Sequence, residues 1–169
     1  HAFGLPEARE AVAAEYRRWG ATVDPAAVAL TASTSEAYSF IFKLLCEPGE
    51  AVLVPVPSYP LFEHLARVEG VEPVGYRLDP EAGWCLDLAE LEEAPTRVRA
   101  VVVVHPNNPT GSFLHPRDAA ALAALAGARG WALVVDEVFL DYTLDGGAGS
   151  GRSLASATEC LTFCLGGLS

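Results

Sequence analysis

Polar and aromatic residues follow directly after apolar runs at several places in this chain, and their types are those of a ligand-binding site. The clearest case is VVVVHPNNPTG at residues 101–111, where four valines lead into a polar turn. Pro106 and Pro109 fix φ in this turn. Asn107 and Asn108 offer amide donors and acceptors between them. A lone Asn-Pro after a strand is usually a plain turn, but further groups along the chain favour a site.

One such group is the hydroxyl-rich run Ser33, Thr34 and Ser35, which stands before an amphipathic segment. A helix that begins here presents unpaired N–H groups and the positive end of its dipole, so it can cradle an anion such as a phosphate. Ser33 and Glu36 also have the spacing of a capping box, which would use the same N–H groups internally. The spacing alone favours neither interpretation.

Two further residues suit an aromatic, cationic ligand. Tyr59 lies between Pro57 and Pro60 and can stack flat on an aromatic ring, although a core tyrosine fits the same pattern. Asp136 follows the apolar run at residues 131–135, where an ionised carboxylate is costly unless it meets a cation. A protonated ring nitrogen would be such a cation.

The apolar periodicity of the chain alternates between helical and strand patterns from end to end. We expect helices at 5–19, 35–46, 60–69, 87–93 and 116–129, and strands at 28–31, 51–54, 71–76, 99–104, 131–135 and 161–164. This alternation predicts an α/β fold, with a mostly parallel sheet covered by helices on both faces. Ligands of such sheets bind beyond the carboxyl ends of the strands. We therefore expect one cleft to collect the candidate residues Ser33, Tyr59, Asn108 and Asp136, with Ser169 ending the last strand.

Composition excludes several classes of partner. The 169 residues carry a net charge of −11 and contain one lysine, Lys43, which argues against binding to nucleic acid or to an anionic membrane. No apolar stretch reaches the length of a bilayer span. The four cysteines lack metal-ligand spacing with histidines and suit a reducing compartment, so we expect a cytoplasmic protein with no metal. The chain contains no methionine, and we expect it to be a piece of a longer protein.

Five segments, in this order and spacing, resemble the class I/II aminotransferases, the fold-type I pyridoxal 5'-phosphate (PLP) enzymes. The segments are LTASTSEAYSFIFKLLCEPGE, VLVPVPSYPLF, HPNNPTG, VVDEVF and LGGLS. The resemblance covers nearly the whole chain. It implies that residues 1–169 are the N-terminal part of the large PLP-binding domain, and that the small domain is not included.

The resemblance assigns a role to each candidate residue. Ser33 and Thr34 match the family's phosphate-binding turn, although the family usually has glycine where Ser33 stands. Tyr59 matches the aromatic residue that stacks on the pyridine ring. Asn108 matches the asparagine that hydrogen-bonds the ring's 3-oxygen, and Asp136 matches the aspartate that keeps the ring nitrogen protonated. A protonated pyridinium withdraws electrons and so stabilises a carbanion at the substrate's α-carbon.

Two departures from the family pattern concern the chemistry. Phe139 stands where the family usually has a tyrosine that donates a second hydrogen bond to the 3-oxygen. The family motif continues Ser-Lys, so we expect the Schiff-base lysine immediately after Ser169 and no catalytic residue within the chain. We interpret Lys43 as a solvated or structural residue rather than a substitute. The chain alone is therefore expected to be inactive. It would also lack a strand that, in the family, lies between the first and last strands of this chain.

The implied activity of the intact protein is PLP-dependent transfer of an amino group between an amino acid and a 2-oxo acid. The family usually forms a homodimer. An amino-acid decarboxylase or a C–S lyase on the same fold is the first alternative, and Phe139 in the tyrosine position favours the decarboxylase. A PLP-sensing regulatory domain without turnover is the second alternative, and an α/β domain that binds no PLP is the third.

Overall fold

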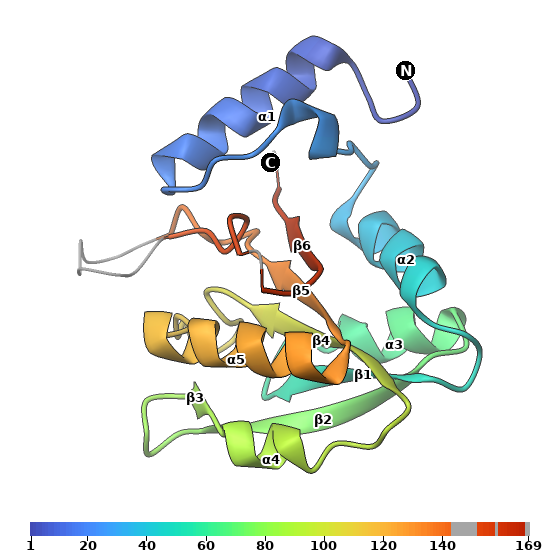
Figure 1. Cartoon of the computed structure of the whole chain (residues 1–169), viewed down its shortest axis with the longest axis vertical. Helices are drawn as coiled ribbons and strands as arrows, with labels where there is room; N and C mark the ends of the chain where they lie inside the picture. Colours follow the sequence, from blue (N-terminus) through green and yellow to red (C-terminus); the bar gives the residue numbers. More distant parts are fainter. Residues whose placement is uncertain (143–151, 158, 168–169) are drawn as a thin grey trace.

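A computed structural model describes residues 1–142, 152–157 and 159–167. These residues form one six-stranded sheet in the order β3-β2-β1-β4-β5-β6 (Figure 1). Every neighbouring pair is parallel except β2 with β3. The strands are β1 (Ala51–Val56), β2 (Glu72–Asp79), β3 (Cys85–Leu86), β4 (Val98–Val104), β5 (Ala132–Asp136) and β6 (Thr162–Leu165). The predicted α/β class with a mostly parallel sheet is confirmed.

Helices cover both faces of this sheet. They are α1 (Pro6–Arg18), the short 3₁₀ helix η1 (Pro25–Ala27), α2 (Thr34–Leu45), α3 (Leu61–Val68), α4 (Leu88–Glu92) and α5 (Pro116–Arg129). Successive side chains of a strand point to opposite faces, so each strand serves two cores. Val52 and Val54 of β1 pack with α2 and α3, whereas Ala51 and Leu53 pack with α4 and α5. The sheet is therefore held from both sides, which fixes the positions of its carboxyl ends.

One predicted strand is wrong. Residues 28–31 pair with no strand among the described residues and instead follow η1 as an irregular segment. The backbone of Leu30 donates to the carbonyl of Phe3 at 3.1 Å. A strand needs the ladder hydrogen bonds of a neighbour, and β6, the last strand on this side of the sheet, pairs only with β5 in the described part of the chain. The other predicted elements lie within a few residues of the observed ones, and β3 was not predicted.

A buried carboxyl joins several segments at the carboxyl end of β5. Glu137 is 2% exposed; its Oε1 accepts from the backbone N–H of Leu154 at 2.7 Å, and its Oε2 accepts from the hydroxyl of Ser153 at 2.8 Å. Tyr16 of α1 and Cys164 of β6 face the same carboxyl group. Burial raises the pKa of Glu137 to about 7 despite these hydrogen bonds. Folding is therefore linked to the protonation of this group.

We predict that Glu137 lowers stability as the pH rises from 4.5 to about 7, because folded Glu137 holds its proton in a range where the unfolded chain has released it. The contribution of this group to the free energy of unfolding should fall by about 3 kcal/mol across this window. Chemical denaturation at a series of pH values measures it. Glu137→Gln, whose amide oxygen still accepts from Leu154, should remove most of this dependence, and the exposed Glu81→Gln should not. Equal pH dependence in all three proteins would contradict the assignment.

Candidate functional site

The carboxyl ends of β1, β4 and β5 bring three polar segments to the same edge of the sheet. Val104 of β4 pairs with Asp136 of β5, so the turn after β4 begins beside Asp136. The turn after β1 is joined to the turn after β4 by the hydroxyl of Ser58, which donates to Oδ1 of Asn107 at 3.0 Å. Tyr59, Asn108 and Asp136 thus lie at one edge of the sheet, as expected. The single cleft that these three residues would form with Ser33 stays a prediction.

The two asparagines of the turn after β4 have different environments. Asn107 is 4% exposed, and its amide nitrogen donates to the carbonyl of Pro57 at 3.1 Å and to the hydroxyl of Thr110 at 2.9 Å. Asn108 is partly buried, and its side chain makes no hydrogen bond to any described residue. Asn107 therefore holds the turn in place, while the amide of Asn108 stays available to a ligand.

Like Asn107, His105 holds the turn after β4 in place. The sequence did not indicate this role of His105. Its ring is 1% exposed. Nδ1 accepts from the backbone N–H of Leu114 at 3.0 Å, so Nε2 is the protonated nitrogen and donates to the carbonyl of Arg152 at 3.1 Å. Burial lowers the pKa of His105. The ring is therefore a neutral structural link between the turn and the segment at residues 152–157.

Asp136 is partly buried and is held by two uncharged donors. Its Oδ1 accepts from the backbone N–H of Val138 at 3.2 Å, and its Oδ2 accepts from the hydroxyl of Tyr38 at 3.0 Å. Burial raises the pKa of Asp136, and the two hydrogen bonds lower it. No ion pair within the described residues involves this carboxylate. It can therefore still meet a cation. The sequence predicted a helix at 35–46 but gave no sign of this contact of Tyr38.

The start of α2 resolves the question that the spacing of Ser33 and Glu36 left open. The hydroxyl of Ser33 caps the backbone N–H of Glu36 at 3.2 Å, but the Glu36 carboxylate accepts from Ala32 at 2.7 Å instead of completing the capping box. The backbone N–H groups of Thr34 and Ser35 have no acceptor among the described residues. Capping therefore leaves two donors of the first turn open to an anion.

The remaining candidate residues differ in accessibility. The ring of Tyr59 is 45% exposed and meets Phe62 edge-on, and the ring of Phe139 is 42% exposed and lies beside Tyr142. Both rings are accessible to a ligand. Lys43 pairs with Glu69, Nζ to Oε2 being 3.2 Å, which suits the structural interpretation. Ser169 lies outside the described residues. The ligand roles assigned to these residues stay predictions.

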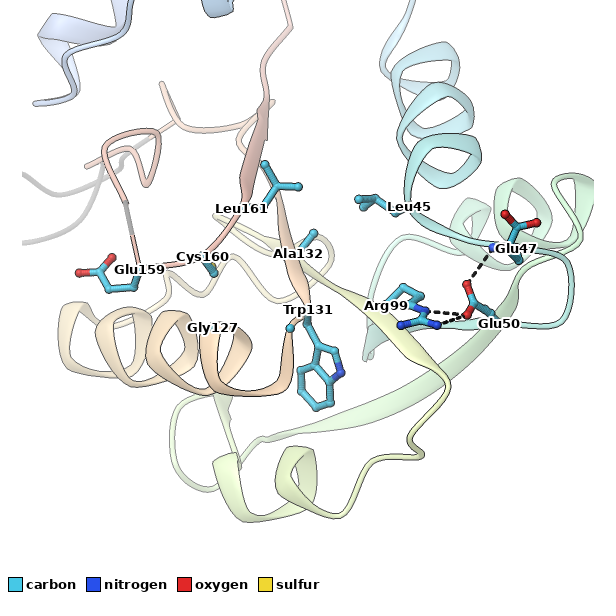
Figure 2. A pocket seen from close by; sticks show the side chains of 11 residues that line it. Leu45, Glu47, Glu50, Arg99, Gly127, Trp131, Ala132, Glu159, Cys160 and Leu161 are labelled. Carbon is cyan, nitrogen blue, oxygen red and sulfur yellow. Dashed lines mark hydrogen bonds and ion pairs between the residues drawn. The ribbon is translucent and has the colours of Figure 1, made fainter.

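A cleft of about 520 Å³ opens at the opposite edge of the sheet. Figure 2 shows that residues at the amino ends of the strands line it, among them Glu50, Arg99, Trp131 and Leu161. Arg99 forms an ion pair with Glu50 there, so its charge is already compensated. None of the candidate residues lines this cleft. In the parts of the chain that the structure describes, no helix has the length and apolar character needed to cross a membrane, and no cluster of metal ligands forms.

Known proteins resemble this chain along its whole length. Residues 1–169 match the family described as aminotransferase class I and II. A valine–pyruvate aminotransferase of Mycobacterium tuberculosis is 35% identical over 139 residues, covering 82% of this chain and 36% of that protein. The structure of an alanine aminotransferase from Pyrococcus furiosus superposes with a TM-score of 0.87 at 34% identity, covering 99% of this chain and 42% of that one.

A tyrosine aminotransferase from Leishmania infantum gives a TM-score of 0.90 at 26% identity, covering 99% of this chain and 47% of that one. The chain thus spans less than half the length of each of these three relatives. The match nevertheless runs through every element of the fold, and it agrees with the order of motifs read from the sequence. The chain belongs to the class I and II aminotransferase family.

Proposed function

We propose that the protein containing this chain is a PLP-dependent aminotransferase, which transfers an amino group between an amino acid and a 2-oxo acid. Residues 1–169 would be the N-terminal part of its PLP-binding domain. Family membership supports this proposal, and so do the names of the relatives, which are aminotransferases of valine, alanine and tyrosine. The observation that carries it is Asp136, a partly buried carboxylate held by neutral donors and facing no cation among the described residues.

The polar groups at the carboxyl edge fit PLP in number and type. The cofactor has an anionic phosphate, an oxygen on its ring and a ring nitrogen that can carry a proton. The first turn of α2 offers open N–H groups for the phosphate. The amide of Asn108, which has no partner among the described residues, suits the ring oxygen, and the carboxylate of Asp136 suits a protonated nitrogen. Tyr38, one helical turn after Thr34, contacts Asp136, so the anion turn lies close to the ring partner.

When bound, PLP supplies an electron-withdrawing ring that stabilises negative charge on the α-carbon of the substrate. Asp136 would hold the proton on the ring nitrogen and so maintain that withdrawal. Asn108 would donate a hydrogen bond to the ring oxygen. Tyr59 would stack on the ring and exclude water, while Ser33 and Thr34 would hold the phosphate.

We further propose a cytoplasmic homodimer. The proposal of a homodimer is supported only by the usual oligomeric state of the family. The cytoplasmic location is supported by the four cysteines, Cys46, Cys85, Cys160 and Cys164, which are all free thiols. Size-exclusion chromatography with light scattering of the full-length protein tests the dimer.

We predict that Asp136→Ala in the full-length protein lowers the rate of transamination by about two orders of magnitude, because a charge-assisted hydrogen bond at the reacting ring is lost. PLP binding should weaken less, since the phosphate turn remains. Single-turnover absorbance kinetics measure the rate, and equilibrium dialysis measures binding. Asp24→Ala, which removes only the cap of η1, is the matched control. An unchanged single-turnover rate in Asp136→Ala would refute the role of Asp136.

We predict that Phe139→Tyr lowers the pH at which bound PLP changes its absorption spectrum, because the new hydroxyl donates to the ring oxygen and stabilises its anion. The exposed position of Phe139 gives the hydroxyl room to form this bond. A spectroscopic pH titration of the full-length protein measures the shift. Phe40→Tyr adds the same hydroxyl at another exposed site, on α2, and should shift nothing. If Phe139→Tyr also shifts nothing, Phe139 does not occupy the tyrosine position of the family.

A further inference from the structure

We propose that Tyr38 is a positioning residue for Asp136: its hydroxyl fixes one carboxylate oxygen and so directs the carboxylate toward the ring nitrogen of the cofactor. This inference rests on the proposed function. It concerns a side chain of α2 that lies one helical turn after Thr34. The contact is 3.0 Å long and joins residues 98 positions apart in the sequence.

The packing around Tyr38 leaves its ring little freedom to move. The residue is 2% exposed. Its ring lies between those of Phe42 and Phe62, with centroid distances of 5.7 and 5.3 Å. A buried phenol loses water on folding and needs an acceptor in return, and Asp136 is the acceptor that the structure supplies. The direction of the hydroxyl is therefore set by the core rather than by solvent.

The hydrogen bonds of Asp136 leave about two lone-pair positions open to a further partner. An ionised carboxylate offers about four lone-pair positions. The backbone N–H of Val138 occupies one on Oδ1, and the Tyr38 hydroxyl occupies one on Oδ2. Both donors are neutral, so the carboxylate is oriented on both oxygens while its negative charge remains uncompensated. An arginine in the place of Tyr38 would orient the group equally well but would compete with the pyridinium for that charge.

The electrostatic surroundings assign the donor role to Tyr38. The ionisable groups facing Asp136 are Tyr38 from α2, Tyr16 from α1 and the adjacent Glu137. Burial, and then the charge of Asp136, raise the pKa of Tyr38 well above its ordinary value, so it stays a neutral donor. The hydrogen bond from Tyr38 opposes the burial that raises the pKa of Asp136. Losing this bond would therefore make Asp136 pick up a proton at a higher pH.

The test measures PLP binding to the full-length protein as a function of pH, by fluorescence or equilibrium dialysis, without reference to turnover. Binding to the pyridinium needs Asp136 ionised, so affinity falls as the pH drops through the pKa of Asp136. In Tyr38→Phe this acid limb should move upward by about one pH unit. Tyr76→Phe is the matched control, because Tyr76 is also 2% exposed but donates to the backbone carbonyl of Val102 at 2.9 Å. Its acid limb should stay in place.

The outcomes separate this inference from the proposed function. If wild-type binding has an acid limb that Asp136→Asn abolishes, but Tyr38→Phe leaves the limb unmoved, the role of Tyr38 is overturned and the function stands. If Asp136→Asn loses PLP affinity at low pH as the wild type does, Asp136 is not the partner of the ring nitrogen. That result would overturn both the role of Tyr38 and the proposed function. If Tyr38→Phe and Tyr76→Phe move the limb equally, the effect is general packing and the Tyr38 inference fails.

A second substitution keeps the test open if Tyr38→Phe does not fold. Replacing Tyr38 with 3-fluorotyrosine keeps the shape of the ring and makes the phenol a stronger donor. The acid limb should then move to lower pH, opposite to the shift in Tyr38→Phe. A limb at the wild-type position in the fluorotyrosine protein overturns the proposal. A purely structural role of Tyr38 predicts no such reversal of sign.

Discussion

An ionised carboxylate taken partly out of water at the end of β5 is the constraint around which the site is arranged. Asp136 cannot spread its charge into solvent, so it needs donors or a cation. The fold supplies two neutral donors and, among the described residues, no cation. Such a carboxylate binds a cationic ligand strongly because the cost of desolvating it has been met during folding. Within the aminotransferase family, this makes Asp136 the residue on which PLP chemistry would depend.

The polar residues around this carboxylate divide into those that hold the backbone and those that remain open. Asn107 and His105 are buried, and their side chains form hydrogen bonds that hold the turn after β4 in place. The side chain of Asn108, the next residue after Asn107, forms no hydrogen bond with any described residue. If neither asparagine side chain formed hydrogen bonds within the protein, the turn would be loosely held. If both did, neither amide could bind a ligand. With Asn107 bonded and Asn108 open, the turn is rigid and presents one amide that has no partner in the described part of the chain.

The adjacent acids Asp136 and Glu137 show the same division. Asp136 faces Tyr38 of α2, whereas Glu137 accepts from Ser153 and Leu154 of a distant segment. Successive residues at a strand end point to opposite sides, so the two carboxyls meet different neighbours. Glu137 is fully satisfied by neutral donors and holds its proton more tightly than usual. It therefore serves the fold, while Asp136 remains available for chemistry.

The amino-acid pattern was sufficient to predict β1, β2, β4, β5 and β6, but not β3, and to predict the edge of the sheet at which Tyr59, Asn108 and Asp136 meet. An apolar run such as residues 101–104 is buried on both sides only in a sheet whose two faces are covered. Parallel strands place their carboxyl ends at the same edge of the sheet. Tyr59, Asn108 and Asp136 accordingly lie at one edge of the sheet, and the order of the motifs indicated the family. The ligand roles of these residues stay predictions.

Features that depend on a partner distant in the chain could not be predicted from the sequence. Residues 28–31 have strand-like side chains, but a strand exists only where another strand supplies its hydrogen bonds, and the described chain supplies none there. The apolar pattern at residues 35–46 predicted an amphipathic helix, yet nothing local indicates that the hydroxyl of Tyr38 meets a carboxylate 98 residues away. Local periodicity specifies which face a side chain takes, because it reflects the geometry of one element. The identity of the atom it meets is set by how the elements pack.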